Sequence, residues 1–307
     1  MIKFKGINSA IMEIYMSKCY LCPRMCGADR DAGERGVCLQ GASIRISRAA
    51  LHAYEEPPIS GTRGSGTVFF SGCSLRCVFC QNRDISRGES AGDLLSVREL
   101  SEIFLRLQGE GAHNINLVTP THFAHKIAEA LRECRQKLSI PVVYNTSGYE
   151  RVETLRSLEG LVDIYMPDFK YASAELAAKY SSAPDYPQVC AEAIREMFRQ
   201  TGAYEYDDDG MLRRGLLIRH LCLPSCRADS MKVFDILSTI LPPEQVLISL
   251  MSQYTPEFYT GEYKELKRRI TSFEYESVLS HLRSLGFEGF MQGRASASSV
   301  YTPDFKK

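Results

Sequence analysis

The sequence lacks a long apolar run, an excess of charge of either sign and a secretion signal. No segment approaches the roughly 20 apolar residues that a membrane-spanning helix requires. The 37 basic residues equal the 37 acidic residues in number, so the composition does not indicate a nucleic-acid groove. Residues 1–20 contain neither a continuous apolar stretch nor a small-residue cleavage site. These absences predict a soluble cytoplasmic protein with no nucleic-acid partner and no membrane association.

Cysteine, in contrast, is abundant, with 11 residues in a chain of 307. Disulfide frameworks belong to small secreted domains, so the chain length and the expected compartment favour metal binding instead. One group of cysteines has the spacing C-x2-C-x3-C-x11-C, and a second has the spacing C-x3-C-x2-C. The first group is Cys19, Cys22, Cys26 and Cys38, and the second is Cys73, Cys77 and Cys80.

From about residue 67 the sequence alternates short apolar runs with helical periodicity, giving six strand–helix units. Strands are predicted at 67–70, 114–119, 141–146, 162–169, 215–223 and 246–251. Ser96 followed by Glu99 is a capping box, which marks the start of the first helix. Nearly continuous apolar strands separated by helices imply a parallel sheet, and right-handed crossovers would curl it into a barrel. We therefore expect an α/β fold, a partial (β/α)6 TIM-like barrel with a small N-terminal metal-binding segment.

The composition also suggests how the chain is divided. Residues 1–60 carry the first cysteine group and end in the stretch EEPPIS, which we interpret as a linker. Residues 61–295 form the predicted barrel, and residues 296–307 are expected to be a tail packed back on it. The first segment is too short for a large core, so bound metal is expected to stabilise its fold.

The second cysteine group directly follows the first predicted strand, at the carboxyl end, where reactive groups lie in such folds. A structural zinc site normally has four protein ligands, and a [4Fe-4S] cluster normally takes four cysteines. Three thiols on one loop would hold three irons and leave the fourth open to a substrate or cofactor. Gly72 permits a tight turn, and Phe79 is expected to shield the cluster from water. For the four N-terminal cysteines, a second iron–sulfur cluster and a zinc ion both remain open.

The stretch CSLRCVFC fits the CxxxCxΦC signature, with Φ an aromatic residue, and so resembles the radical S-adenosylmethionine superfamily. Longer features are similar to homologues of pyruvate formate-lyase activating enzyme that carry an extra N-terminal cysteine segment. These features are CYLCPRMCGADRDAGERGVC, ISGTRGSGTVFFSGCSLRCVFCQN, NINLVTPTHF, YMPDFKY and YTPDF.

The resemblance implies a radical enzyme with a [4Fe-4S] cluster held by Cys73, Cys77 and Cys80. In the superfamily, S-adenosylmethionine chelates the open iron, a low-potential flavodoxin or ferredoxin supplies an electron, and a 5′-deoxyadenosyl radical abstracts a hydrogen atom. The substrate implied by the activating enzymes is a glycyl radical enzyme as protein partner. A small molecule or peptide is the alternative substrate, and a nonenzymatic iron–sulfur or zinc protein is a remote third reading.

The resemblance also suggests residues near the cofactor at the carboxyl ends of the strands. The turn from Thr119 to His122 replaces the family's glycine-glycine-glutamate segment, so only backbone groups of Thr119 are expected to contact the cofactor. Asn145 and Ser147 end the third strand, with Asn145 in place of a carboxylate. At the fourth strand, the resemblance implies that Asp168 and Lys170 lie near the cofactor carboxylate, with a monovalent cation as a further expectation. Side-chain alternation places both on one face.

His220 and Gln253 are weaker candidates at the ends of the fifth and sixth strands. Several of these residues have a simpler interpretation. Asp168 and Lys170 could form a structural ion pair, and His220 could be a hydrogen-bonded strand histidine. His122 and His125 are interpreted as surface residues at a helix start.

Overall fold

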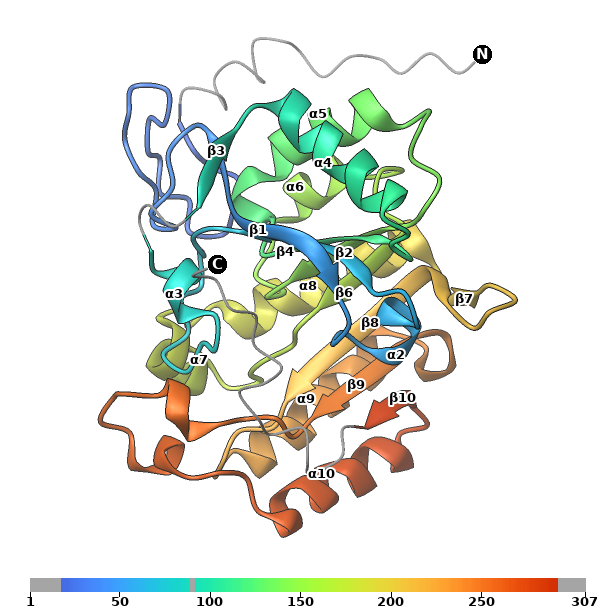
Figure 1. Cartoon of the computed structure of the whole chain (residues 1–307). Coiled ribbons are helices and arrows are strands. Elements are labelled where there is room, and N and C mark those ends of the chain that lie inside the picture. Colours follow the sequence, from blue (N-terminus) through green and yellow to red (C-terminus); the bar gives the residue numbers. More distant parts are fainter. Residues whose placement is uncertain (1–17, 89–91, 292–307) are drawn as a thin grey trace.

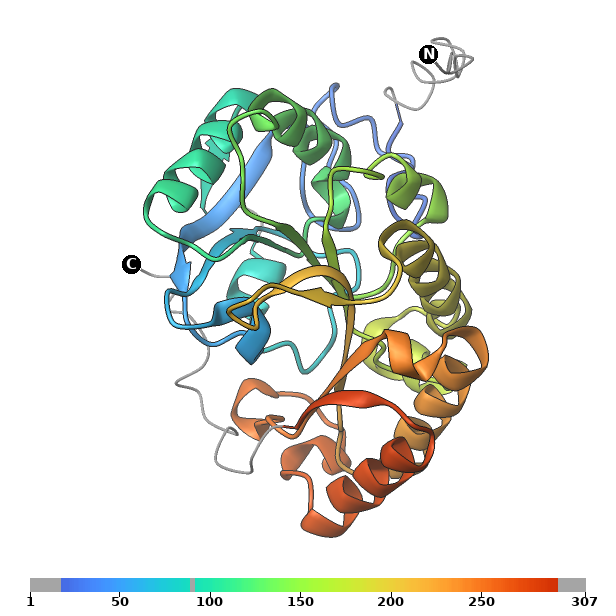
Figure 2. The ribbon, with the colours of Figure 1, turned by 90° about the vertical axis from the view of Figure 1, so that its right-hand side faces the viewer.

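A curved sheet with helices along its convex side forms the body of the protein (Figures 1 and 2). The computed structural model of the chain describes residues 18–88 and 92–291. Within these ranges the sheet has the strand order β10-β9-β8-β6-β5-β4-β2-β1-β3, and β7 pairs with β8. The strands are β1 (Ile44–His52), β2 (Ser65–Phe70), β3 (Asp93–Leu95), β4 (Ile115–Val118), β5 (Val142–Thr146), β6 (Ile164–Pro167), β7 (Glu205–Tyr206), β8 (Leu212–Leu221), β9 (Leu247–Met251) and β10 (Glu288–Met291).

The six predicted strands correspond to β2, β4, β5, β6, β8 and β9, and every pairing between neighbours among them is parallel. The prediction of a partial barrel of strand–helix units is therefore confirmed. The helices are α2 (Pro57–Ser60), α3 (Arg83–Ser86), α4 (Val97–Gly109), α5 (Ala124–Cys134), α6 (Val152–Arg156), α7 (Ala174–Ser181), α8 (Tyr186–Thr201), α9 (Arg227–Ile240) and α10 (Ser272–Ser284). The capping box that starts α4 is also confirmed, because the Ser96 hydroxyl accepts from the Glu99 amide and the Glu99 carboxylate accepts from the Ser96 amide.

Four strands that the periodicity did not predict, β1, β3, β7 and β10, extend the sheet, with β3 and β10 at its two ends. β1 pairs antiparallel with β2, and β10 pairs parallel with β9. β1 belongs to the N-terminal segment of the chain, yet it shares one sheet with the barrel strands. Residues 1–17 and the tail predicted at 296–307 lie outside the described residues.

Side chains alternate between the two faces of the sheet, and this alternation decides what reaches the concave side. The larger core packs strands against the outer helices and includes Tyr144, Ile218 and Leu250. A smaller core on the concave side includes Val143, Leu217 and Leu247, together with Ile59 of α2. Because α2 packs into this smaller core, the stretch EEPPIS that we interpreted as a linker instead enters the concave side of the sheet.

Several residues in phase with the smaller core are polar, and most of them lie toward the carboxyl ends of the strands. They are Asn116, Asn145, Asp168, Arg219 and Ser249. Polar groups on the inner face near the carboxyl ends are where catalysis is placed in related barrels.

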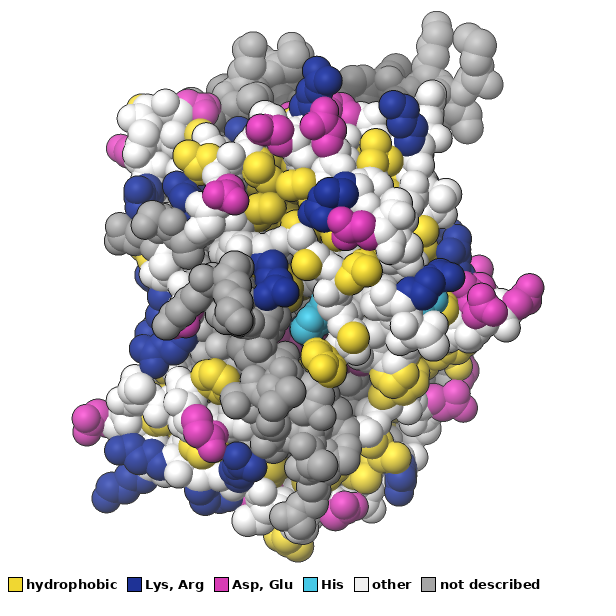
Figure 3. Space-filling view, viewed as in Figure 1, with side chains coloured by type: hydrophobic (Ala, Val, Ile, Leu, Met, Phe, Trp, Pro, Cys, Tyr) yellow, Lys and Arg dark blue, Asp and Glu magenta, His cyan; other side chains and the backbone are white. Residues whose placement is uncertain are grey.

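The outer surface does not show a dominant charge sign. On the face in Figure 3, Lys and Arg side chains are interspersed with Asp and Glu over much of the visible surface. Among residues 18–88 and 92–291, no helix combines the length and apolar character needed to cross a bilayer.

Candidate functional site

The loop with the second cysteine group leaves β2 through a sharp turn at Gly72. Gly72 has a φ of +83°, a left-handed value that glycine adopts at little cost. A Cβ built on Gly72 would lie 2.4 Å from the backbone oxygen of Cys38. The turn therefore depends on glycine both for its backbone angle and for its close contact with the N-terminal segment.

The three thiols of this loop are close enough to influence one another. Burial, followed by the charge of the neighbouring Cys77, raises the pKa of the Cys73 thiol to about 12. The Ser181 hydroxyl donates to Cys77 Sγ at 3.1 Å, and the Ser86 hydroxyl donates to Cys80 Sγ at 3.5 Å. Burial also raises the pKa of the Cys80 thiol, and a bound metal group is what would remove the protons of Cys73 and Cys80.

Three cysteine thiols on one loop are a donor set that fits an iron–sulfur cluster with one open corner. Within the described ranges, no group of three or more His, Cys, Asp or Glu side chains is arranged to hold one metal ion. Zinc needs thiolates that converge at about 2.3 Å from one centre. The corners of a cubane instead separate the thiolates, and hydrogen bonds to cysteine sulfurs, like those from Ser86 and Ser181, are one means of setting cluster potential.

Phe79, on the same loop, packs inside a ring of tyrosines. Its ring lies 6.4 Å from Tyr171, 6.2 Å from Tyr180 and 6.2 Å from Tyr254, always edge-on. Tyr254 belongs to the segment after β9, so this segment folds over the cysteine loop. The predicted shielding role of Phe79 agrees with this packing, since 8% of the residue is exposed.

Asp168 and Lys170 meet beside the cysteine loop, as their alternation along the strand predicts. Lys170 Nζ lies 2.5 Å from Asp168 Oδ2, and both side chains are largely buried. Burial alone would raise the pKa of Asp168, but Arg219 and Lys170 hold it below its usual value. Burial alone would lower the pKa of Lys170. The negative charges of Asp168 and Cys77 outweigh this effect and raise the pKa above its usual value. The carboxylate and the ammonium are therefore both charged.

Arg219 is the main component of this network that the sequence did not reveal. Its Nε donates to Asp168 Oδ1 at 3.0 Å, its Nη2 donates to Asn145 Oδ1 at 2.6 Å, and its Nη1 lies 3.4 Å from Glu55 Oε2. Since two cationic side chains neutralise Asp168, the structure gives no support for the monovalent cation predicted beside it. Asn145 has the position expected of it and serves as an acceptor for Arg219.

His220, the neighbour of Arg219, faces the other way. Its Nδ1 bonds to the Phe169 carbonyl at 2.6 Å, its Nε2 bonds to the Ser230 hydroxyl at 2.8 Å, and its ring packs on Phe234 of α9. The convex side of the sheet holds this residue, so it is not among the residues that line the cavity described below. The arrangement agrees with the simpler interpretation of a hydrogen-bonded strand histidine.

The turn after β4 is held by a buried carboxyl from the next loop. Thr119 has a φ of +59°, and its amide donates to the Asn145 carbonyl. The hydroxyls of Thr121 and Thr146 both donate to Glu150 Oε1. Burial raises the pKa of Glu150 to about 7. The glutamate that contacts the turn after β4 is therefore Glu150 of the loop after β5, and not a residue of the turn itself.

His122 is buried, which contradicts its interpretation as a surface residue. Its Nε2 donates to the Ser71 carbonyl at 2.7 Å, and its own carbonyl accepts from Arg30 Nη1 at 2.7 Å. Because Ser71 precedes Gly72, this histidine connects the β4 turn to the cysteine loop. The burial of His122 could not be predicted from the sequence, because its partners Ser71 and Arg30 are remote in the chain. His125 is partly buried.

Cys19, Cys26 and Cys38 of the N-terminal group lie near the guanidinium of Arg30. Arg30 Nη2 donates to Cys38 Sγ at 3.2 Å, and its charge opposes the effect of burial on the pKa of Cys19 and Cys38. A Cβ on Gly36 would lie 3.2 Å from Cys26 Sγ and 3.4 Å from Cys38 Sγ. The spacing therefore does bring these thiols together, as expected for ligands of one group.

This segment docks directly on the barrel beside the second cysteine group. Arg24 Nε donates to the Ser74 carbonyl at 2.8 Å, and Arg24 Nη2 donates to the Ser181 carbonyl at 2.8 Å. Arg151 and Thr154 donate to the carbonyls of Tyr20 and Leu21.

A cavity of about 490 Å³ occupies the concave side of the sheet. Gln81 and Asn82, which follow the cysteine loop, line one end together with Gln253. Deeper in, the lining includes Asn145, Arg219, Ser249, Glu55 and Glu56. Gln253 thus lies where it was predicted, whereas the contact found for Ser147 is its carbonyl, which accepts from Tyr186.

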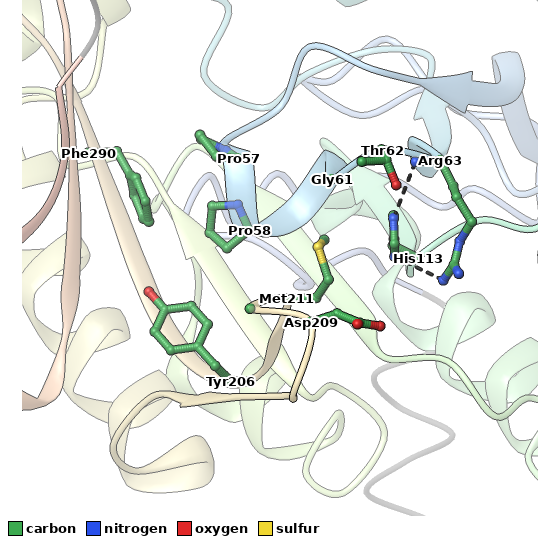
Figure 4. Close-up of a pocket in the computed structure, with 11 residues that line it drawn as sticks. Pro57, Pro58, Gly61, Thr62, Arg63, His113, Tyr206, Asp209, Met211 and Phe290 are labelled. Carbon is green, nitrogen blue, oxygen red and sulfur yellow. Dashed lines mark hydrogen bonds between the residues drawn. The ribbon is translucent and has the colours of Figure 1, made fainter.

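A larger pocket, of about 640 Å³, lies elsewhere (Figure 4). It is bounded by Pro57 and Pro58, the β7–β8 hairpin and the hydrogen-bonded pair Arg63–His113. Arg63 and His113 precede β2 and β4, so this pocket lies at the amino ends of the strands, away from the cysteine loop. We therefore place the candidate site in the 490 Å³ cavity.

Comparison with known proteins identifies a domain type in this part of the chain. The radical SAM superfamily model matches residues 67–202. A protein of Methanocaldococcus jannaschii, uncharacterized protein MJ0674, is 30% identical over 280 residues, which cover 88% of this chain and 75% of that protein.

Solved structures share the fold at low identity. A radical SAM methyltransferase from Sphaerobacter thermophilus superposes with a TM-score of 0.51 at 16% identity, covering 74% of this chain and 66% of the methyltransferase. SuiB of Streptococcus suis, bound to the precursor peptide SuiA, superposes with a TM-score of 0.50 at 13% identity, covering 72% of this chain and 46% of SuiB. The chain thus spans about two thirds or less of either neighbour.

Proposed function

Because the chain belongs to the radical SAM superfamily, we propose that it abstracts a hydrogen atom from a small molecule bound on the concave side of its barrel. The observation that supports the proposal is the position of three mutually interacting thiols at the mouth of a cavity with buried charged groups. Cys73, Cys77 and Cys80 would hold a [4Fe-4S] cluster, with S-adenosylmethionine at the open iron. When bound, these groups supply an electron and a 5′-deoxyadenosyl radical.

The residues of the chain would position the cofactor and exclude water. Lys170 and Arg219 would present positive charge toward the cofactor carboxylate, with Asp168 holding both cations in place. Asn145 fixes the plane of the Arg219 guanidinium. Phe79 and the surrounding tyrosines would keep water from the cluster side of the cavity.

A small substrate is favoured because the deep wall of the cavity carries ionisable groups. A glycine loop of a partner protein offers only backbone groups and has no charge to match Glu55, Glu56 or Arg219. A glycyl radical enzyme as substrate is the second candidate. The juxtaposition of Asp168 and Lys170 favours it, because this stretch resembles the Asp-x-Lys of activating enzymes.

The N-terminal cysteines would hold a second iron–sulfur cluster rather than zinc. Cys19, Cys26 and Cys38 lie near the Arg30 guanidinium, which donates to Cys38 Sγ. Radical SAM enzymes need a reductant, and here we propose a low-potential flavodoxin or ferredoxin.

The test is anaerobic reconstitution of the full chain with iron and sulfide, followed by reduction in the presence of S-adenosylmethionine. The wild type is expected to release 5′-deoxyadenosine, and replacing Cys73, Cys77 and Cys80 with alanine should abolish this release and remove about four irons. Cys134→Ala is the matched control, because Cys134 is a buried thiol of α5 outside the site. Replacing the four N-terminal cysteines should remove a further, separate set of irons.

Wild-type protein that binds iron but never yields 5′-deoxyadenosine would contradict the enzymatic proposal. Zinc retained in stoichiometric amount after iron reconstitution, and lost with the N-terminal cysteines, would contradict the second cluster. Electron paramagnetic resonance distinguishes the substrates, since only the activating function would create a glycyl radical on a partner enzyme.

A further inference from the structure

Glu55 and Glu56 lie between β1 and α2 and enter the concave side of the barrel. They lie outside the matched superfamily region, and yet both line the cavity. The side chain of Glu55 is 9% exposed and Glu56 is 7% exposed. Buried glutamates are rare unless they are paired, so the partners of these two carboxyls indicate their purpose.

Glu55 has protein partners for both of its oxygens. Asn116 Nδ2 donates to Oε1 at 3.0 Å, and Arg219 Nη1 approaches Oε2 at 3.4 Å. The second contact is long, because Arg219 makes its shorter bonds to Asp168 and Asn145. Glu55 is therefore positioned firmly but only partly neutralised.

Glu56 is held mainly by its backbone. Its carbonyl accepts from the amides of Ile59 and Ser60, which fixes it at the start of α2. The Ser249 hydroxyl lies near the Glu56 carboxyl and opposes the effect of burial by lowering its pKa, yet among the described residues neither Glu56 Oε2 nor the Ser249 hydroxyl has a hydrogen bond of normal length. A buried carboxyl oxygen and its neighbouring hydroxyl, both lining one cavity and both without a normal hydrogen bond, leave acceptor capacity for a ligand that donates hydrogen bonds.

The charges around the cavity are also unequal. Within residues 18–88 and 92–291, three carboxylates belong to this network, those of Glu55, Glu56 and Asp168. Only two cations oppose them, Arg219 and Lys170, and both are already bonded to Asp168. Burial, opposed by Arg219, raises the pKa of both glutamates. A proton or a cationic ligand would complete the balance.

We propose that Glu55 and Glu56 bind a cationic nitrogen group, an ammonium or guanidinium, of the small-molecule substrate. This inference rests on the proposed function and specifies its substrate class. Such a group donates several hydrogen bonds to carboxylates and supplies the missing charge. Ser249 lies at mid-strand in β9, whereas Met251 and Gln253 lie at or beyond the strand's carboxyl end. The cationic end of the substrate therefore lies deep, and the remainder extends toward the cysteine loop.

The test measures binding to the anaerobically reconstituted full chain in the unreduced state, with saturating S-adenosylmethionine. The probes are n-butylammonium and n-butylguanidinium, with 1-butanol as the neutral and butyrate as the anionic comparison of similar length. Calorimetry or saturation-transfer NMR gives the dissociation constants. The two cations should bind at least about tenfold more tightly than 1-butanol, the effect of a hydrogen bond to a charged group.

Two variants locate the effect. Glu56→Gln is nearly isosteric and should reduce the affinity for the cations about tenfold while leaving that for 1-butanol unchanged. Glu102→Gln, on the exposed face of α4, is the matched control and should leave all four affinities unchanged. If Glu56→Gln does not fold, the wild-type ranking of the four probes still decides the question.

Equal affinities for the four probes, or a preference for butyrate, would overturn the assignment. So would an unchanged cation preference in folded Glu56→Gln, which would indicate a structural, protonated glutamate. A parallel weakening of S-adenosylmethionine binding in Glu56→Gln would reassign the carboxyl to the cofactor, whose own groups are cationic. Failure of the proposed function appears differently, as absent 5′-deoxyadenosine in the wild type, and leaves the probe ranking untouched.

Discussion

Replacing Arg219 with methionine tests whether the buried charge network stabilises the barrel. The substitution removes the hydrogen bonds to Asp168 and Asn145 and the longer contact with Glu55. Lys170 remains bonded to Asp168, so the main cost is that the Glu55 carboxylate loses its cation. Breaking a buried pair by removing one partner typically costs about 3–5 kcal/mol. At about 2 °C per kcal/mol for a chain of this size, the melting temperature should fall by about 6–10 °C.

The assay is anaerobic scanning calorimetry of the reconstituted protein at neutral pH. Arg98→Met removes a pair exposed on α4 and is the matched control, with an expected shift within about 2 °C. Adding Glu55→Gln to Arg219→Met should recover about 1–2 kcal/mol, because the uncompensated carboxylate is gone. The melting temperature of Arg219→Lys should lie between those of the wild type and Arg219→Met, because lysine keeps the positive charge but lacks the planar guanidinium.

The reasoning is refuted if Arg219→Met melts within the range of the Arg98 control. It is also refuted if the double variant is no more stable than Arg219→Met alone, because the loss would then come from packing rather than from charge.

Two further predictions concern the cysteine loop and its surroundings. Glu150 has a pKa of about 7 in the folded chain against an ordinary 4.5, so the folded state binds more protons between these values. Stability should therefore fall as pH rises from about 4.5 to 7, by up to about 3 kcal/mol, and Glu150→Gln should lack this slope. Melting curves at pH 5 and pH 8 measure it, with Glu153→Gln as the exposed control, and a flat wild-type profile would contradict it. Gly72→Ala should lower both the melting temperature and the bound iron, because its Cβ meets the Cys38 carbonyl. Gly33 also has a left-handed φ, but a Cβ added there would meet no atom within 4 Å, so Gly33→Ala is the control and should retain its bound iron. Equal iron content in the two variants would argue against the contact with the Cys38 carbonyl.

The sequence was sufficient to predict the repeated strand–helix units because their strands are buried on both faces and read as apolar runs. β1 and β10 escaped prediction for the opposite reason. Every residue of β10 is at least partly exposed, and most of β1 is partly exposed, so neither gives a continuous apolar pattern. Which strands form the edges of a sheet depends on their pairing with other strands, and the residue pattern of one strand does not reveal that pairing.

The pattern of a single strand also explains why His220, and not Arg219, was predicted as a site residue. Alternation places the two side chains on opposite faces, but both faces of β8 are apolar near residues 216–218. The sequence therefore did not indicate which face is concave. Glu55 and Glu56 were overlooked because two prolines follow them, and the stretch resembles a linker. Asp168 and Lys170 could be predicted because their separation of two residues fixes their relation whichever face they occupy.

The contact between Gly72 and the Cys38 carbonyl has a consequence for how the protein matures in a cell. The two cysteine groups share a boundary at this contact. Arg24 of the N-terminal segment donates to the Ser74 carbonyl of the cysteine loop, and Arg30 donates to the His122 carbonyl of the β4 turn. In the proposed holoenzyme the two centres would therefore support each other during maturation: a newly synthesised chain that fails to assemble the first would hold the second less firmly.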